Sequence, residues 1–309
     1  MSRVALVLVY NHRYDGNIEV LERLYGGRFR DIYHLVPFYS GNRPNVIPVY
    51  GSSYYFQGYV AQGLRHYFRE ETEHYLFVAD DLLLNPVVNE ENYAAHLGLG
   101  PGACFLPAFY QFHLIDRGFW MHVEKAYRWT VEAPGVEARP HLPSYEEALE
   151  RFRRNGLDLR PLRFGQVWDL PRTARGWIEK ALRDPGLCLS FLGSLVGRKS
   201  YFLSYPLVGG YSDLFAVSSD AIREFCQYCG VFAATDLFVE HAIPTALALA
   251  AKSITVESEL KLRGKALWTA AEMKELDRYA GSLRALVEQF PADRLYLHPV
   301  KLSRWRNDL

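Results

Sequence analysis

The stretch YLFVADDL, residues 75–82, places an apolar strand directly before two adjacent carboxylates, Asp80 and Asp81. In open α/β sheets, ligands bind just beyond the carboxyl ends of the strands. Two carboxylates crowded at such an edge repel each other and favour a bound cation. Their hard oxygen atoms suit Mg²⁺ or Mn²⁺. The stretch therefore predicts a divalent cation site, with a plain acidic cap on the following turn as the alternative.

The segments before this stretch predict the opening of a nucleotide-binding α/β sheet. Residues 4–10 form a continuous apolar run, which is typical of a strand buried on both faces. The pattern predicts further strands at 31–38, 45–50 and 74–79, and helices at 17–25 and 55–71. Strand, helix, strand, strand, helix, strand is the order expected for such a sheet.

The rest of the chain is expected to form an insertion and a second half of the same domain. Residues 115–200 hold many charges, several prolines and an amphipathic helix at 144–155, which begins with the capping-box pair Ser144 and Glu147. They predict a mainly helical region on the acceptor side. The predicted division is 1–114, 115–200 and 201–309.

The final third is predicted to return to alternating strands and helices. Strands are expected at 201–208, 214–217 and 254–259, helices at 220–229, 236–252 and 270–290, and an irregular tail at 295–309.

Composition excludes several classes of protein. Lys+Arg and Asp+Glu each number 35, and a chain with no basic excess is a poor general nucleic-acid binder. Four cysteines in 309 residues do not suggest a disulfide framework, and the pair Cys226 and Cys229 predicts a buried, reduced helical pair. The apolar run after Arg3 is too short for a signal peptide, and no stretch approaches a membrane span. We expect a cytoplasmic protein with possible peripheral membrane contact.

Asp80 and Asp81 also carry a family resemblance. A strand followed by x-Asp-Asp after an opening βα half resembles the D-x-D-type motif of GT-A-fold glycosyltransferases, some of which carry x-D-D variants. In that family the last Asp contacts the metal that bridges the diphosphate of a nucleotide sugar. The resemblance implies Asp81 as the direct ligand and Asp80 as a second ligand or a ribose contact. It departs from many members at Ala79, where they have an acidic residue.

A second resemblance lies near the end of the chain. His298-Pro299-Val300-Lys301 resembles the H-x-x-G-x-K segment of glycogenin-like and lipopolysaccharide galactosyltransferase-like enzymes, with a shorter His-to-Lys spacing and no Gly. It implies that His298 completes the metal site and that Lys301 contacts the diphosphate. The alternatives are a turn histidine packed beside Trp305 and a solvated lysine.

Three further carboxylates are candidates for catalysis. The glycines of GGYSD, residues 209–213, let the backbone approach a ligand closely, so Asp213 is a candidate acceptor or sugar-hydroxyl ligand. Asp236 and Glu240 are four apart and are expected on one helical face, where either is a candidate general base for an inverting reaction. In a retaining reaction the site would stabilise an oxocarbenium-like transition state. A helix cap and a solvated face are the alternatives.

Three residues are candidate donor contacts on position alone. Tyr10 is placed to stack on the nucleobase, Asn11 to meet the nucleotide, and Arg65 to reach the ribose or phosphate.

The sequence thus predicts a metal-dependent, hexosyltransferase-type glycosyltransferase of glycan or polysaccharide biosynthesis. Its fold class would be α/β, a GT-A-like mixed sheet flanked by helices with a mainly helical insertion. It would use Mn²⁺ or Mg²⁺ and a nucleoside diphosphate sugar, with a glycan, a lipid-linked sugar or a small hydroxyl compound as acceptor. A sugar-phosphate nucleotidyltransferase ranks second, since residues 11–16 hold one Gly where that class has a Gly-rich loop. A non-catalytic nucleotide- or glycan-binding protein is the third reading.

Overall fold

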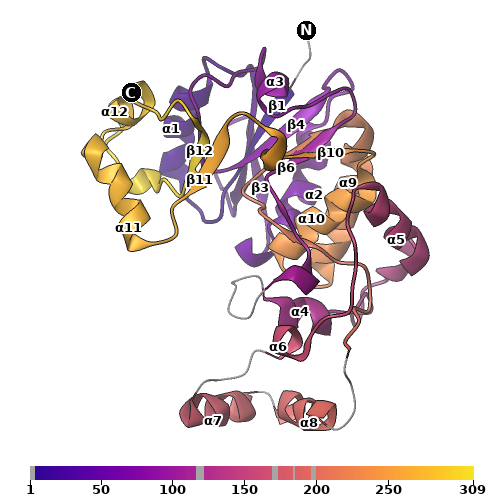
Figure 1. The fold of residues 1–309 in the computed structure, drawn as a ribbon. Coiled ribbons are helices and arrows are strands. Elements are labelled where there is room, and N and C mark those ends of the chain that lie inside the picture. Colours follow the sequence, from indigo (N-terminus) through magenta and orange to yellow (C-terminus); the bar gives the residue numbers. More distant parts are fainter. Residues whose placement is uncertain (1–3, 116–121, 169–172, 184, 196–199) are drawn as a thin grey trace.

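A seven-stranded mixed sheet forms the centre of the molecule (Figure 1). The computed structural model describes residues 4–115, 122–168, 173–183, 185–195 and 200–309. Across the sheet the strand order is β10-β6-β9-β4-β1-β2-β3. In chain order these strands are β1 (Val4–Val9), β2 (Asp31–Pro37), β3 (Val46–Val49), β4 (His74–Ala79), β6 (Cys104–Leu106), β9 (Leu214–Ser218) and β10 (Ile254–Val256).

The direction of β9 positions the candidate site. β9 runs antiparallel to β4 and β6, whereas β1 pairs in parallel with both β2 and β4. Leu214, the first residue of β9, lies opposite Val78 near the end of β4. The entrance of β9 therefore lies at the same sheet edge as the carboxyl ends of the parallel strands.

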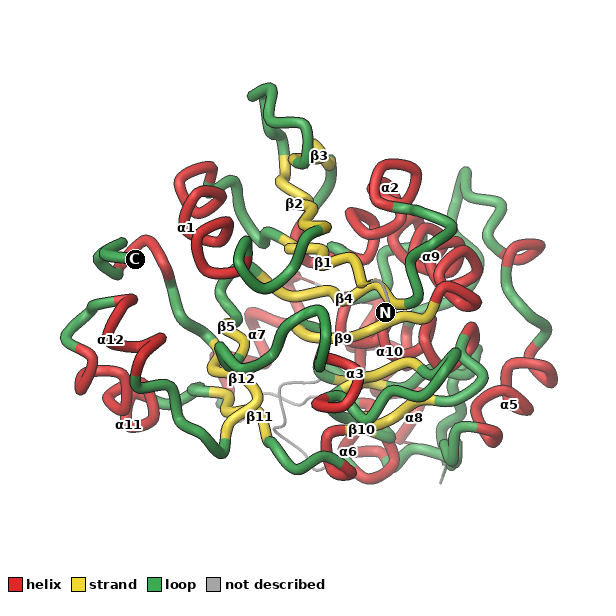
Figure 2. Tube along the Cα trace, turned by 90° about the horizontal axis from the view of Figure 1, so that it is seen from above, coloured by secondary structure: helices red, strands yellow, loops and turns green. Residues whose placement is uncertain are grey.

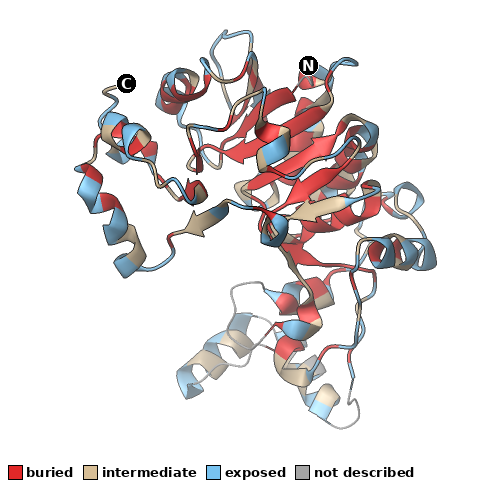
Figure 3. Ribbon diagram, turned by 45° about the horizontal axis from the view of Figure 1, so that its top comes forward, coloured by how far each residue is buried: buried red, intermediate tan, exposed pale blue. Residues whose placement is uncertain are grey.

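Both faces of the sheet are covered, as the apolar run at 4–10 predicts. Alternate residues of β1 belong to two core clusters, with Leu6 in one and Val7 in the other. Helices α2 (Gln57–Tyr67), α9 (Ser219–Ala234) and α10 (Val239–Ala250) contribute to the cluster of Val7, and α1 (Asp15–Tyr25) contributes to that of Leu6. Figure 2 shows α1 on one side of the sheet and α2 with α9 on the other, and Figure 3 shows the buried strands between them. The expected mixed α/β sheet flanked by helices is confirmed.

Two smaller sheets extend this centre. The first consists of β5 (Leu83–Leu84), β11 (Arg263–Ala266) and β12 (Arg294–His298), and the second of β7 (Phe109–Tyr110) and β8 (Gly209–Gly210). The remaining helices outside the insertion are α3 (Tyr93–His96), α11 (Ala270–Met273) and α12 (Leu283–Glu288).

The expectation of an irregular tail is wrong, because β12 forms there. β12 finds its antiparallel partner in β5, and this pairing aligns Leu297 with Leu83. A partner so distant in the sequence leaves no local signal. The single helix expected at 270–290 is also wrong, because Ala280 and Gly281 adopt positive φ and end the helical run.

Two other boundaries differ from expectation. Residues 201–208 form no strand: Tyr201 makes an isolated bridge with Leu162, and the next strand, β8, begins at Gly209. The helix expected from Asp236 begins instead at Val239, because Asp236 has a φ of 56° between α9 and α10. Asp236 and Glu240 therefore do not share a helical face.

The described residues between 115 and 200 form helices, which are α4 (Val123–Arg128), α5 (Tyr145–Arg154), α6 (Phe164–Val167), α7 (Ala174–Arg183) and α8 (Pro185–Leu195). The expected capping box at the start of α5 is present, with the Glu147 amide donating to the Ser144 hydroxyl and the Ser144 amide donating to the Glu147 carboxylate. The boundaries 1–114, 115–200 and 201–309 remain predictions.

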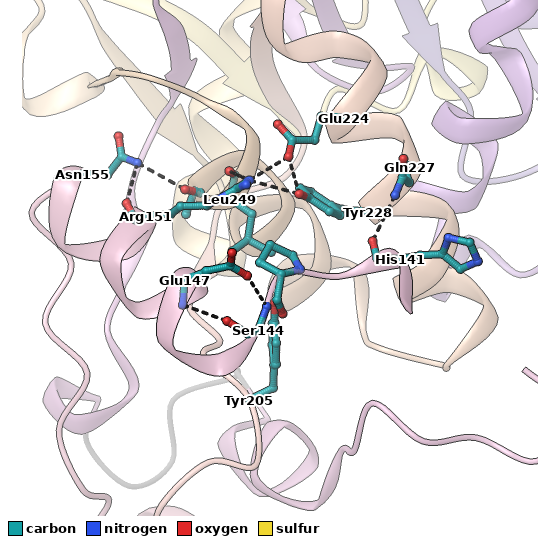
Figure 4. Close-up of polar contacts among 12 residues, drawn as sticks. His141, Ser144, Glu147, Arg151, Asn155, Tyr205, Glu224, Gln227, Tyr228 and Leu249 are labelled. Atoms are coloured by element: carbon teal, nitrogen blue, oxygen red, sulfur yellow. Dashed lines mark hydrogen bonds and ion pairs between the residues drawn. The ribbon is translucent and has the colours of Figure 1, made fainter. Parts of the chain in front are cut away.

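One arginine fastens α5 to the central helices (Figure 4). Arg151 Nη1 donates to Glu224 Oε1 at 2.7 Å and to the Tyr228 hydroxyl at 3.0 Å, both on α9. It also donates to the Leu249 carbonyl of α10 at 2.8 Å. A single guanidinium thus ties three helices together.

Candidate active site

Three side chains from distant parts of the chain meet at the carboxyl edge of β4. The Nε2 atom of His298 lies 3.2 Å from Asp81 Oδ1 and 3.9 Å from Asp213 Oδ2. Asp81 follows β4, Asp213 precedes β9, and His298 ends β12. The structure therefore brings together two residues predicted as metal ligands and one predicted as a sugar or acceptor contact.

Backbone hydrogen bonds hold the three segments in place. The Ala79 amide donates to the Asp213 carbonyl at 2.8 Å, and the Val300 amide donates to the Asp81 carbonyl at 2.6 Å. The Asp80 amide donates to the Val9 carbonyl at 2.9 Å, which extends the β1–β4 pairing into the acidic turn. These hydrogen bonds therefore fix the segments that carry the site residues to the strands of the sheet.

Asp80 faces away from this group, towards β1 and α1. Only 5% of it is exposed, and its Oδ2 accepts a hydrogen bond of 3.1 Å from the Asn17 side chain. Its Oδ1 accepts from the Asn11 amide at 3.5 Å. Burial, with the neighbouring charge of Asp81, raises the pKa of Asp80 to about 7. Near neutral pH, Asp80 can therefore be either protonated or charged beside Asp81. Asn11 lies next to Asp80, just after the end of β1.

His298 is oriented by contacts on its other face. Its Nδ1 atom lies 2.7 Å from the Tyr211 hydroxyl, so Nε2 faces the carboxylates. Burial alone lowers the pKa of His298, but the charges of Asp213 and Asp81 outweigh burial and raise it. By contrast, burial raises the pKa of Asp213, and the charge of His298 opposes that shift. The protonation states of Asp81, Asp213 and His298 therefore depend on one another.

Glu240 lies in the first turn of α10 with an unsatisfied carboxyl oxygen. Its Oε2 atom is buried and has no hydrogen-bond partner among the described residues. Burial and the charge of Asp213 raise the pKa of Glu240 to about 9. At neutral pH the side chain therefore holds its proton, which opposes the general-base role expected from the sequence. In this state Glu240 is a hydrogen-bond donor.

The other predicted site residues lie in different surroundings. Asp236 and Lys301 are exposed. Tyr10 is fully buried with its hydroxyl 2.9 Å from His34, so its ring cannot stack on a nucleobase. Arg65 lies near the end of α2, where the chain returns to the amino end of β4, and its Nε lies 3.1 Å from His66. That end of β4 is opposite to the acidic turn, so the predicted nucleotide contacts of Tyr10 and Arg65 do not fit this structure.

Sequence reasoning missed four residues at this edge. Asn17 contacts Asp80 and Tyr211 contacts His298. The sequence places Asn17 in the first turn of a predicted helix just after the first strand, and that position is the signal that could have identified it. Phe38 and Tyr50 follow β2 and β3, with 55% and 59% of each exposed and their ring centroids 5.7 Å apart. Phe38 also has a φ of 55°, an uncommon backbone conformation for an aromatic residue.

Among the described residues, no group of three or more His, Cys, Asp or Glu side chains has the arrangement needed to hold a metal ion. Asp81 and Asp213 instead approach the same nitrogen of His298. In this structure the two carboxylates thus pair with the imidazole of His298.

Comparisons with known proteins give distant structural similarity alone. No protein-family description matches the chain, and no curated protein matches it. Among solved structures, the chain is similar to one described as the apo structure of WbbM, a bifunctional glycosyltransferase, with 11% identity and a TM-score of 0.38. The match covers 96% of this chain and 45% of that chain, so this chain spans less than half of that protein's length.

Proposed function

We propose that this protein is a metal-dependent glycosyltransferase that moves a sugar from a nucleoside diphosphate to a hydroxyl acceptor. The observation that carries the proposal is the meeting of Asp81, Asp213 and His298 at the carboxyl edge of the sheet. In open α/β sheets this edge is where ligands bind. Carboxylates that are crowded together in a partly buried site favour a bound cation.

The donor atoms suit a divalent cation of the Mn²⁺ or Mg²⁺ type. Two carboxylates and an imidazole form an appropriate ligand set for Mn²⁺. Ligand atoms around a cation with bonds near 2.1 Å lie about 3 to 4 Å apart, and Asp81 Oδ1 and Asp213 Oδ2 lie 3.2 and 3.9 Å from His298 Nε2. Asp81, Asp213 and His298 would hold the cation, and Asp80 would add negative charge behind them. When bound, the cation would neutralise the departing diphosphate as a Lewis acid.

The nucleotide would lie along the same edge, towards β2 and β3. Strands in a sheet are about 4.8 Å apart, so β2 lies about 10 Å from β4. The exposed rings of Phe38 and Tyr50 offer the stacking surface that the buried Tyr10 cannot. Asn11 would contact the nucleotide between these rings and the acidic turn. Lys301, three residues beyond His298, would reach the diphosphate.

The acceptor would approach from the start of α10. Glu240 would donate a hydrogen bond from its protonated carboxyl to a sugar or acceptor oxygen. Asp236, exposed in the loop before α10, is then the candidate for general base in an inverting reaction.

The proposal is tested by donor binding and donor turnover. Thermal shifts would be measured with a panel of nucleoside diphosphates and nucleotide sugars, with and without Mn²⁺, because ligand binding stabilises by RT ln(1 + [L]/Kd). One nucleotide is expected to raise the melting temperature only with the metal present. Asp81→Asn should abolish that shift, whereas Asp158→Asn, which alters an exposed aspartate paired with Arg160, should retain it.

The outcomes also separate the alternatives. Release of nucleoside diphosphate with transfer of the sugar supports a glycosyltransferase, whereas exchange of pyrophosphate into a sugar nucleotide would make the protein a nucleotidyltransferase. If the protein binds a nucleotide in a metal-dependent way but turns over none of the donors and acceptors offered, it is a non-catalytic binding protein. The absence of a shift with every nucleotide would overturn the donor site itself.

A further inference from the structure

Tyr296 lies next to the candidate active site, in the small sheet that also contains β11. It belongs to β12, two residues before His298, and only 5% of it is exposed. Its ring stacks on that of Tyr211, with the ring centroids 5.7 Å apart and the ring planes at 12° to each other. The hydroxyl of Tyr211 lies 2.7 Å from His298 Nδ1. The ring of Tyr296 therefore supports the side chain that orients His298.

Gly264 of β11 leaves the space that this ring occupies. A Cβ atom at position 264 would fall on the Cζ and Cε1 atoms of the Tyr296 ring. A glycine inside a strand often marks a place where another group approaches the backbone closely. Because the ring is buried and stacked on Tyr211, a side chain at position 264 would displace it, and close packing would pass this displacement on to Tyr211.

The pairing of β11 with β12 is irregular at the same point. Arg263 pairs with Arg294, but Lys265 pairs with Leu297. Between these pairs β11 advances two residues, from 263 to 265, and β12 advances three, from 294 to 297. β12 therefore has one extra residue opposite Gly264. Such bulges re-aim side chains and are common next to active sites.

β11 also holds the backbone of His298. Ala266 pairs with His298 in the register of the two strands, and the Leu267 amide donates to the His298 carbonyl at 2.7 Å. Gly264 thus lies on the strand that fixes the backbone of His298, and it also contacts the ring behind Tyr211.

Glu257 connects Gly264 and Tyr296 to the central sheet. It follows β10 directly, and its amide donates to the Pro107 carbonyl at 3.1 Å. Burial raises the pKa of Glu257, and hydrogen bonds from the Gly264 amide and the Tyr296 hydroxyl oppose that shift. The position of the Tyr296 ring therefore depends on contacts with both sheets.

We propose that Gly264 and Tyr296 are positioning residues of the candidate active site: the glycine admits the ring of Tyr296, and the ring holds Tyr211 where its hydroxyl orients His298. A side chain at position 264 would then turn the imidazole away from Asp81 without contacting either residue. The orientation of His298 is a property of the fold alone, whereas its effect on cation binding rests on the proposed function.

Nuclear magnetic resonance of isotope-labelled histidine in the metal-free full chain tests the positioning. The imidazole signals of His298 are identified by their absence in His298→Gln. Gly264→Ala is expected to shift the Nδ1 signal in the same direction as Tyr211→Phe, which removes the hydroxyl beside that atom. Gly100→Ala is the matched control, because a Cβ atom there would meet nothing within 4 Å, and it should leave the signal unchanged.

A second variant covers the case in which Gly264→Ala does not fold. Tyr296→Leu keeps an apolar side chain but removes the stacked ring, so it should shift the same Nδ1 signal. An Nδ1 signal that stays unchanged in the folded variants would overturn the proposal.

Calorimetry with Mn²⁺ measures the consequence for the site. Groups that orient a metal-binding imidazole affect metal affinity by about 10- to 100-fold, so Gly264→Ala should lower Mn²⁺ affinity about tenfold. If Gly264 acts through Tyr211, the two effects should not add. The double variant Gly264→Ala with Tyr211→Phe should therefore bind Mn²⁺ about as weakly as Tyr211→Phe alone.

Losses of Mn²⁺ affinity that multiply in the double variant would overturn the path through Tyr211. An unaltered chain that binds no Mn²⁺ would instead contradict the proposed function, and the Nδ1 signals would still decide whether Gly264 and Tyr296 position His298.

Discussion

The carboxyl group of Glu240 is buried and protonated in the folded protein, and it loses its proton when the protein unfolds at neutral pH. Its pKa of about 9 in the folded protein exceeds the value of about 4.3 expected in an unfolded chain. Between these values the folded state binds one proton more than the unfolded state, so its contribution to stability is complete below about pH 4.3 and is lost as pH rises towards about 9. The slope is at most about 1.4 kcal/mol per pH unit.

Glu240→Gln should remove this contribution, because glutamine has a similar shape and does not ionise. From about pH 5 to about pH 8 the variant is expected to gain up to about 4 kcal/mol relative to the unaltered chain, measured by urea unfolding. Glu288→Gln, at an exposed position, should leave the pH dependence unchanged. Parallel pH profiles for Glu240→Gln and the unaltered chain would show that the folded protein does not hold this proton.

Tyr211 is expected to affect binding of the proposed cation through His298. Tyr211→Phe removes the hydroxyl that lies 2.7 Å from Nδ1 and should cost about 1 kcal/mol of unfolding free energy. Because such contacts orient a metal-binding imidazole, Mn²⁺ affinity should also fall about tenfold, as followed by calorimetry. Tyr205→Phe removes a similar buried hydroxyl, bonded to the Pro143 carbonyl, and should lower stability alone. Equal Mn²⁺ affinity in both variants would refute the role of Tyr211.

At the scale of elements, α5 depends on Arg151. Arg151→Met keeps an apolar stem but leaves Glu224, Tyr228 and the Leu249 carbonyl without their shared donor. We expect a loss of about 1–2 kcal/mol in urea unfolding, since the group is partly exposed. Arg153→Met, on the exposed face of the same helix, should change stability by less than about 0.5 kcal/mol. A loss no larger at Arg151 than at Arg153 would show that the three bonds add little.

Elements with a strong local pattern were predictable, and those defined by distant partners were not. The apolar run predicts β1, and the capping box predicts the start of α5, each from a short stretch of the sequence. β12 has no such signal, because its identity comes from β5. The same reasoning explains the site: Asp81 and His298 could be proposed from short motifs, whereas the burial of Tyr10 and the exposure of Phe38 depend on packing that a sequence does not display.

At the scale of the whole molecule, the segment after Asp293 is part of the core. It contributes five buried apolar side chains, which are Leu295, Tyr296, Leu297, Val300 and Leu302. At about 1.5–3 kcal/mol each, their loss would remove roughly 8–15 kcal/mol, which equals the entire stability of a typical domain. A chain ending at Asp293 is therefore expected to show no cooperative thermal transition in calorimetry.

The contrasting control removes the α7–α8 hairpin. Replacing residues 172–199 by a short Gly/Ser linker should preserve a cooperative transition, because none of the residues of α7 is buried. If the truncated chain melts cooperatively and the chain without the hairpin does not, the assignment of these segments to core and periphery is reversed.

The contact between Asp81 and His298 joins residues 217 positions apart. During synthesis the acidic turn leaves the ribosome long before the histidine, so the growing chain carries two crowded carboxylates without their basic neighbour. Contacts of such long sequence separation form late and slowly. Until they form, the proposed site is incomplete, and we expect the nascent chain to gain donor binding only when β12 has joined β5 in the small sheet.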